Sequence, residues 1–293
     1  MDPLTTEVAR VTVHMAPVQT EHSRGAVADR LNVTSSGRPD APVVLFAHGF
    51  GCDQGMWDGV LPHFTADHRL VRFDLMGAGR SDTSLYDPVH YATLDGHAAD
   101  ILAICAELDL HDVTLVAHSV STMMAVLAAI AEPQRFRQLV LVGANPYFLD
   151  DPATGYTGGF SAADLAEVSA ALDSNYFTWA EAFAPLIMGT PDTPELGDAL
   201  TASFCRVDPD IARQLLTTMF STDYRPLLPR VVTPTVLLQA RADAMVPPSV
   251  ADHLHAQLAG STLVQLAAVG HCPHISAPEE TAAAIRAQLL PAR

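Results

Sequence analysis

VTLVAHSVSTMMAVLAAIA, residues 113–131, contains a predicted strand and a predicted helix that meet at a single serine. Residues 113–117 are β-branched and apolar, the pattern of a central strand that is buried on both faces. From Val120 to the residue before Pro133 the sequence is rich in Ala, Met and Leu and contains no Gly or Pro, so we expect a helix. Ser119 therefore lies between a strand and a helix N-terminus, the place of the serine in a nucleophile elbow.

Ala117 and Ser121 occupy the two positions that are glycines in the usual elbow pattern, Gly-x-Ser-x-Gly. Both residues are small, which fits a tight turn with no room for bulky side chains beside the serine. The free amides of the helix N-terminus would stabilise an anion forming at Ser119. The alternative is that Ser119 only caps a buried helix, because serine is a favoured N-cap residue.

Length and composition indicate one α/β domain with an insertion. The chain has 293 residues, 49% of them hydrophobic, enough for one large core. The formal net charge of −17 argues against nucleic acid or an anionic membrane surface as a partner. The four cysteines form no CxxC pair, so we expect neither a disulfide framework nor a zinc site but a reducing cytoplasm.

Neither a signal peptide nor a membrane span is expected. The N-terminus lacks a basic segment followed by an apolar core. No apolar run approaches the roughly 20 residues that a bilayer requires. Residues 1–28 show no sustained period, which predicts a flexible N-terminal extension with a short strand at residues 11–13.

Strand and helix patterns alternate along most of the remaining chain. Further strands are expected at residues 43–47, 70–73, 139–142, 235–239 and 262–266. Helices are expected at residues 94–108 and 249–258, and VTSSGRPD at 33–40 is typical of a turn. Alternation at this pitch predicts a mostly parallel sheet flanked by helices, formed by residues 29–144 and 226–293.

The strand pattern is absent from residues 145–225, which we predict to be a helical lid. Four helices are expected there, at residues 161–172, 178–187, 195–205 and 209–220. Ten aromatic residues lie between positions 147 and 220, which indicates a cover over an apolar pocket. The alternative is that most of these aromatic side chains form the core of the insertion itself.

Two polar residues follow the late strands. Asp243 precedes a proline-bounded turn, where the carboxylate of a catalytic triad is expected. His271 follows a glycine after the last strand and completes the chain order Ser, Asp, His of α/β-hydrolases. His274 is the alternative base, although His271 is closer to the expected end of the strand. His253 and His255 are two residues apart on a helix and do not face each other, so they form no metal site.

HGFG, residues 48–51, follows the strand at residues 43–47 directly. Glycine here lets the backbone turn along the carboxyl edge of the sheet, where ligands bind in open α/β folds. We expect the backbone amides of Phe50 and Val120 to form an oxyanion hole. The alternative is an ordinary glycine-rich connection.

The two glycines of residues 73–82 resemble part of a dinucleotide-binding fingerprint. The third glycine and the following helix of that fingerprint are missing. We therefore expect a structured loop in which Asp74 and Ser81 accept hydrogen bonds from backbone amides.

Five motifs together resemble the RsbQ-like α/β-hydrolases, which comprise bacterial stress-response regulators and their plant relatives, the karrikin and strigolactone receptors. The motifs are HGFGCDQGMW (48–57), FDLMGAGRSD (73–82), YATLDGHAADI (91–101), HSVS (118–121) and GHCPHIS (270–276). The resemblance covers residues 30–290. It implies an α/β-hydrolase core under a V-shaped four-helix lid, with a Ser-His-Asp triad and a small, closed hydrophobic pocket.

The resemblance also implies roles for individual residues. Ser119, Asp243 and His271 correspond to the triad, and the amides of Phe50 and Val120 to the oxyanion hole. The side chains that correspond to the pocket are Phe50, His118, Phe148, Trp179 and Phe183.

These residues predict a serine hydrolase that cleaves a small hydrophobic ester or lactone through an acyl-enzyme, without a metal or organic cofactor. A serine nucleophile in place of aspartate argues against haloalkane dehalogenase or epoxide hydrolase chemistry. One alternative is a ligand-sensing regulator of the RsbQ type, with slow or single turnover and a regulatory protein partner. The other is a biosynthetic enzyme that reuses the fold.

Overall fold

A computed structural model describes residues 26–291. The strand expected at residues 11–13 lies outside this range, as does most of the predicted extension. A short helix, α1 (Val27–Arg30), begins one residue before the predicted end of that extension. No helix within the described range is long and apolar enough to cross a membrane.

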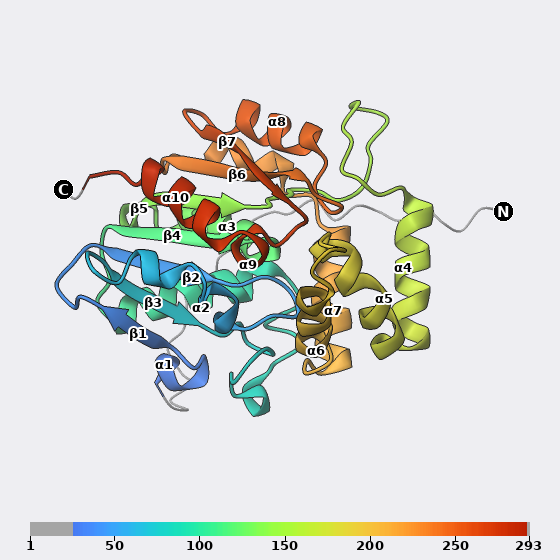
Figure 1. Ribbon diagram of the computed structural model, residues 1–293, viewed down its shortest axis with the longest axis horizontal. Coiled ribbons are helices and arrows are strands. Elements are labelled where there is room, and N and C mark those ends of the chain that lie inside the picture. Colours follow the sequence, from blue (N-terminus) through green and yellow to red (C-terminus); the bar gives the residue numbers. More distant parts are fainter. Residues whose placement is uncertain (1–25, 292–293) are drawn as a thin grey trace.

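The strands of the described chain form one seven-stranded sheet in the order β1-β3-β2-β4-β5-β6-β7 (Figure 1). Their bounds are β1 (Thr34–Gly37), β2 (Val43–Ala47), β3 (Arg69–Phe73), β4 (Val113–His118), β5 (Phe136–Val142), β6 (Thr235–Ala242) and β7 (Thr262–Val269). Strand β1 is antiparallel to β3, and every other neighbouring pair is parallel. The predicted mostly parallel sheet is confirmed.

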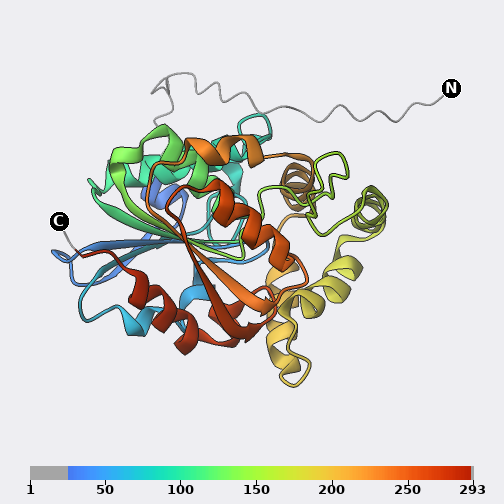
Figure 2. The ribbon, with the colours of Figure 1, turned by 90° about the horizontal axis from the view of Figure 1, so that it is seen from above.

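Helices cover both faces of this sheet (Figures 1 and 2). One face packs against α2 (Leu94–Glu107), α3 (Val120–Ala131) and α8 (Pro248–Gln257), and the other against α10 (Pro278–Gln288). Along β2, Leu45 belongs to the first core and Phe46 to the second. Because successive side chains point to opposite faces and both faces are buried, each central strand is an unbroken apolar run in the sequence.

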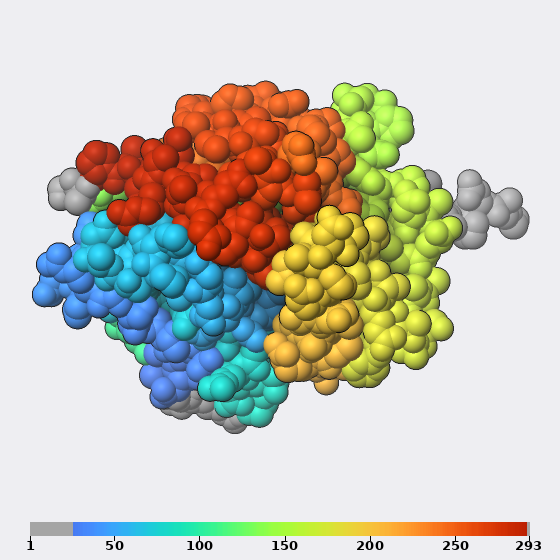
Figure 3. Space-filling model, viewed as in Figure 1, coloured from blue at the N-terminus to red at the C-terminus, as the bar shows by residue number. Residues whose placement is uncertain are grey.

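Four helices of the described chain are inserted between β5 and β6: α4 (Ala162–Ser174), α5 (Tyr176–Met188), α6 (Pro194–Phe204) and α7 (Pro209–Ser221). They lie together at one end of the sheet, on the right in Figure 1. Ser161 caps α4 in a capping box with Asp164, and Gly189 ends α5 in a left-handed conformation. Figure 3 shows the yellow and orange part of this insertion directly against the blue and red parts of the chain.

The prediction of a turn at residues 33–40 is wrong for Thr34–Gly37, because these residues form the edge strand β1. All four residues are exposed, so no apolar pattern marks them as a strand. The strand forms because its backbone pairs with that of β3, for example Ser35 with Val71. The strand predicted at residues 43–47 is confirmed, whereas β5 begins three residues before its predicted start.

Gly270 connects β7 to His271 and lies against the end of α5. Its φ is +82°, and a Cβ atom at this position would lie 1.8 Å from the carbonyl oxygen of Met188. Gly270→Ala should therefore lower the free energy of unfolding by more than the about 1 kcal/mol of left-handed strain alone.

Gly260→Ala is the matched control, because Gly260 has a φ of +70° and no other described atom lies within 4 Å of a Cβ there. Urea unfolding measures the loss of unfolding free energy in each variant. The loss in Gly270→Ala includes left-handed strain and the clash with Met188, whereas the loss in Gly260→Ala includes the strain alone. Equal losses of stability at the two positions would contradict the close contact between Gly270 and α5.

Candidate active site

Ser119 occupies the turn between β4 and α3, with φ +56° and ψ −125°. These angles are strained for a residue other than glycine, and such strain persists only where surrounding contacts hold it. The Ser119 amide donates to the carbonyl oxygen of Val142 (3.0 Å), and the Ser119 carbonyl accepts from the amide of Thr122 (2.9 Å). Strand β5 and helix α3 therefore hold the turn from both sides.

The residues in place of the two elbow glycines differ in what they contact. Ala117 is fully buried and pairs with Ala47 on one side and Leu141 on the other. Ser121 donates from Oγ to the carbonyl oxygen of His48 (2.5 Å), a bond that glycine cannot make. The Ser121 hydroxyl thus joins the start of α3 to the end of β2, a contact that residue size alone does not predict.

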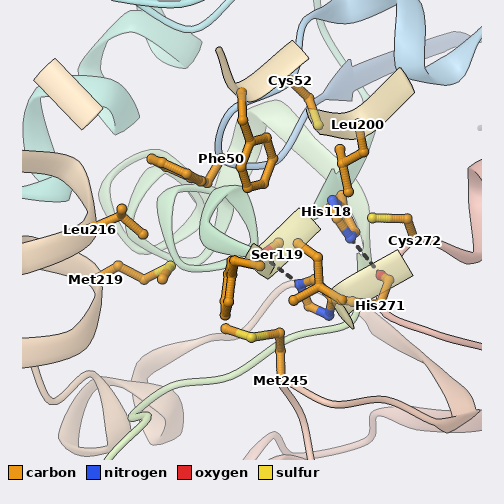
Figure 4. Close-up of a pocket in the computed structure, with 13 residues that line it drawn as sticks. Phe50, Cys52, His118, Ser119, Leu200, Leu216, Met219, Met245, His271 and Cys272 are labelled. Carbon is orange, nitrogen blue, oxygen red and sulfur yellow. Dashed lines mark hydrogen bonds between the residues drawn. The ribbon is translucent and has the colours of Figure 1, made fainter. Parts of the chain in front are cut away.

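His271 lies within hydrogen-bonding distance of both Ser119 and Asp243. Its Nε2 is 2.8 Å from Ser119 Oγ (Figure 4), and its Nδ1 is 2.8 Å from Asp243 Oδ2. Asp243 Oδ1 accepts from the amides of Met245 (2.8 Å) and Val246 (3.2 Å). An ionised carboxyl group only accepts hydrogen bonds, so the proton on the neutral His271 ring belongs on Nδ1. Nε2 is then free to accept from the Ser119 hydroxyl.

The backbone of His271 is held from two further directions. Its amide donates to the carbonyl oxygen of Ile187 at the end of α5 (2.7 Å), and its carbonyl is 2.8 Å from Nε2 of His118. Burial lowers the pKa of His118 well below its usual value, and the neighbouring His274 and His271 lower it further. A neutral His118 can therefore donate from Nε2 and fix the carbonyl of His271.

His274, the alternative base, lies in the short helix α9 (Pro273–Ser276) and makes no hydrogen bond to Ser119 within the described residues. Its ring packs between Trp57 and His118, with centroid distances of 4.5 and 4.3 Å. It is fully buried, and burial lowers its pKa to about 3. His271, rather than His274, is the histidine that the structure brings to Ser119.

A small apolar cavity lies beside Ser119 (Figure 4). Its wall combines side chains of the core with side chains of α5, α6 and α7. The core residues are Phe50, Cys52, His118, Ser119, Met245, His271 and Cys272, and the inserted ones are Phe183, Ile187, Leu200, Phe204, Leu216 and Met219. Phe50, His118 and Phe183, three of the predicted pocket residues, thus line this cavity.

Phe148 and Trp179 are not in this wall, contrary to the sequence-based expectation. Trp179 lies behind it and stacks on Phe183 and Phe204, with centroid distances of 4.7 and 6.1 Å. Phe148 packs edge-on against Phe220 at 5.2 Å. Both side chains pack inside the insertion. This agrees with the alternative given for residues 145–225, that most of their aromatic side chains form the core of the insertion itself.

The cavity wall contains several residues that sequence reasoning missed. Leu216 and Met219 are three residues apart on α7, so they share one face of that helix. Met245 and Cys272 are neighbours of Asp243 and His271 in the sequence. Helical spacing and proximity to the candidate triad are signals that could have indicated all four.

The two thiols in the wall are poor nucleophiles at neutral pH. Burial raises the pKa of Cys52 to about 12 and that of Cys272 well above its usual value. Nowhere in residues 26–291 do three or more His, Cys, Asp or Glu residues form a group suited to a metal ion. Ser119, whose Oγ lies 2.8 Å from His271 Nε2, is the candidate nucleophile in this wall.

The loop after β2 passes close over Ser119. A Cβ atom on Gly49 would lie 2.5 Å from Nδ1 of His118 and 3.3 Å from Cβ of Ser119, so a glycine allows this approach. The amide of Phe50 donates to no other group within residues 26–291. Val120 is the first residue of α3, where an amide has no partner inside the helix. One unpaired amide therefore lies in the loop that passes over Ser119, and the other directly follows Ser119 in the chain.

The structured loop predicted at residues 73–82 is confirmed. Asp74 accepts from the amides of Gln54 and Arg80, both at 2.8 Å. The Ser81 hydroxyl accepts from the amide of Gly77 (3.0 Å). Asp74 thereby joins the loop after β3 to the segment after β2.

Comparison with known proteins identifies the family. Residues 44–284 match a model described as the alpha/beta hydrolase family. The chain belongs to this family. The membership confirms the predicted fold and hydrolase class.

Two curated proteins are each 39% identical to this chain over 256 residues, covering 87% of it and 94% of the relative. One is a probable esterase of Oryza sativa subsp. japonica, and the other is the karrikin insensitive 2 receptor CA of Petunia hybrida. A solved hydrolase from Oleispira antarctica is similar with a TM-score of 0.86 and 34% identity, covering 89% of this chain and 95% of its own. The predicted resemblance to the karrikin and strigolactone receptor group is confirmed.

Within this alpha/beta hydrolase, His274→Phe should weaken the pH dependence of stability. The pKa of about 3 in the folded state lies below the ordinary 6.5 of an unfolded chain. The unfolded state therefore binds more protons in acid, and stability falls as the pH drops below 6.5. Phenylalanine does not titrate, so the loss of unfolding free energy between pH 7 and pH 5 should be about 2 kcal/mol smaller than in the wild type.

Urea unfolding of wild type and variant at the two pH values measures this difference. Equal losses of stability in the two proteins would contradict a neutral, buried His274.

Proposed function

We propose that this protein is a serine hydrolase that cleaves a small hydrophobic ester or lactone through an acyl-enzyme. The observation that carries the proposal is the unbroken chain of hydrogen bonds from Ser119 through His271 to Asp243, with 2.8 Å at each step. The apolar cavity beside Ser119 supports a small hydrophobic substrate. The esterase named among the relatives supports the reaction class.

Acylation begins when Ser119 Oγ attacks the carbonyl carbon of the substrate. His271 Nε2 removes the hydroxyl proton, and Asp243 stabilises the imidazolium that forms. The carbonyl oxygen becomes an oxyanion and accepts hydrogen bonds from the amides of Phe50 and Val120. Collapse of the tetrahedral intermediate breaks the ester bond, and His271 gives the proton to the departing alkoxide.

Deacylation repeats these steps with water as the nucleophile. His271 removes a proton from the water, which attacks the acyl carbon of the Ser119 ester. The carboxylic acid is released, and the proton returns to Ser119 Oγ. Neither half of this reaction requires a metal or an organic cofactor.

Helices α4–α7 act as the lid of this site in our proposal, within a segment spanning residues 145–225 between the two parts of the core. Six residues of the cavity wall belong to α5, α6 and α7, which supports this role. Ser119 is only 9% exposed, which supports a role of these helices in covering it. The four cysteines are free thiols, which supports a location in a reducing cytoplasm.

The second candidate function is a ligand-sensing regulator with slow or single turnover and a regulatory protein partner. A relative with 39% identity is named as a receptor, which favours this candidate. The hydrogen bond between Ile187 of α5 and His271 supports it further, because a covalent change at the site would reach the inserted helices directly.

Ser119→Ala should abolish hydrolysis of p-nitrophenyl acetate and butyrate. Removal of a serine nucleophile lowers kcat by about 10⁴-fold or more. Release of p-nitrophenol by wild type and variant measures the loss. Ser221→Ala is the control, because within the described residues that exposed hydroxyl bonds only to its own helix, at Thr217 (2.7 Å), and its loss should leave activity unchanged.

The course of product release separates the two candidate functions. Sustained turnover that disappears in Ser119→Ala supports the hydrolase, and a single equivalent of product supports the regulator. A wild-type protein that releases no p-nitrophenol, or a variant as active as the wild type, would contradict both.

Met219→Ala should broaden the acyl-chain preference. Met219 lines the cavity, so its truncation makes room for further methylenes. The ratio of kcat/KM for p-nitrophenyl octanoate to that for the butyrate should rise about tenfold. Met123→Ala is the control, since Met123 is equally buried but lies outside the cavity wall. The same change of ratio in both variants would contradict Met219 as the limit on chain length.

A further inference from the structure

Helices α5 and α6 contact both loops that meet at Ser119. The end of α5 accepts a hydrogen bond from the amide of His271, through the carbonyl oxygen of Ile187 (2.7 Å). The end of α6 contacts the other loop, since Ser203 Oγ donates to the carbonyl oxygen of Gly51 (2.8 Å). Gly51 directly follows Phe50, whose amide is one of the two unpaired donors beside the elbow.

Arg206 donates to the same Ser203 hydroxyl, which can only donate to Gly51 because a carbonyl oxygen only accepts. The Nη2 atom of Arg206 lies 3.1 Å from Ser203 Oγ and 3.0 Å from Oδ2 of Asp53. A guanidinium only donates, so the Ser203 oxygen accepts from Arg206 and its single hydrogen points to Gly51. Because Arg206 is charged, its donation to the Ser203 oxygen also strengthens the hydrogen bond from Ser203 to Gly51.

The contacted segment is a tight turn with little freedom of its own. The amide of Cys52 lies 3.4 Å from the carbonyl oxygen of Gly49, which closes a four-residue turn with Phe50 and Gly51 in its centre. Gly51 has a φ of +69°, as the third residue of a type II turn requires. The bond across the turn is long, so the turn depends on outside contacts to fix its orientation.

We propose that Ser203 is a positioning residue for the oxyanion hole: its hydroxyl holds the Gly51 carbonyl and thereby aims the Phe50 amide at the substrate. This inference rests on the proposed hydrolase function. It assigns an inserted helix a part in catalysis beyond covering the cavity. Movement of α6 would misalign the oxyanion hole, whereas movement of α5 would misalign His271.

Other contacts keep α6 in place, so the Ser203 hydroxyl can be removed without displacing the helix. The Phe204 ring packs edge-on against Phe50 with a centroid distance of 5.2 Å. Tyr176 donates from its hydroxyl to the carbonyl oxygen of Phe204 (2.9 Å). A Cβ atom on Gly51 would lie 2.3 Å from the Phe204 ring, so helix and turn are in tight contact even without the hydroxyl.

Ser203→Ala, Ser203→Thr and the control Ser221→Ala test the inference with p-nitrophenyl butyrate. Loss of alignment at the oxyanion should lower kcat of Ser203→Ala about 10- to 100-fold and change KM by less than about threefold. Ser203→Thr retains the hydroxyl and should restore most of the activity. The pH dependence of kcat/KM should stay as in the wild type, because His271 keeps its contacts with Asp243 and Ile187.

Inhibitor binding distinguishes positioning from a structural role. Butylboronic acid forms a tetrahedral adduct with Ser119 and places an oxygen in the oxyanion hole, whereas butyramide binds the same cavity without an adduct. Affinity of Ser203→Ala should fall for the boronic acid by the same factor as kcat and stay unchanged for butyramide. Thermal unfolding of all variants reports their stability.

Three results would overturn the inference. They are a kcat of Ser203→Ala equal to that of Ser221→Ala, equal losses of affinity for the two inhibitors, and failure of Ser203→Thr to restore activity. In each of these cases the wild type remains active and the proposed function stands. A wild-type protein that neither turns over ester nor binds butylboronic acid would overturn the proposed function together with this inference.

Discussion

The hydrogen bond between His271 Nε2 and Ser119 Oγ joins segments that are 152 residues apart in the chain. The other contacts of the site hold these two atoms at this distance. Strands β4 and β5 with helix α3 fix the strained turn at Ser119, and Asp243 fixes the ring of His271. His118 and Ile187 hold the carbonyl and the amide of His271. These supports come from β4, β5, α3, α5 and the segment after β6, so the site depends on both the sheet and the insertion.

Burial determines which of the neighbouring groups can act as a base or a nucleophile. His118 and His274 stay neutral because their burial disfavours the cation, and the thiols of Cys52 and Cys272 stay protonated for the same reason. Only His271 combines contact with Ser119 and a carboxyl partner. The low polarity of the cavity therefore leaves one serine and one histidine for the proposed reaction.

The sequence predicted those parts of the molecule that follow from local pattern. Strands buried on both faces are continuous apolar runs, so both ends of β2 could be predicted to the residue. Ser119, Asp243 and His271 each follow a strand, and the sequence could place them near one another because parallel strands end at the same edge of the sheet. Strand β1 was missed because its four residues are exposed and only pairing with β3 makes them a strand. Trp179 was expected in the cavity wall, but whether an aromatic side chain faces a cavity or the layer behind it depends on how helices pack together.

The account depends most directly on Ser119 being an activated nucleophile. A fluorophosphonate probe labels such a serine covalently, and peptide mass spectrometry of the labelled protein locates the modified residue. The account predicts stoichiometric labelling on the peptide that contains Ser119, with none in His271→Gln, which lacks the base. Labelling that is absent from the wild type, or that persists unchanged in His271→Gln, would contradict it.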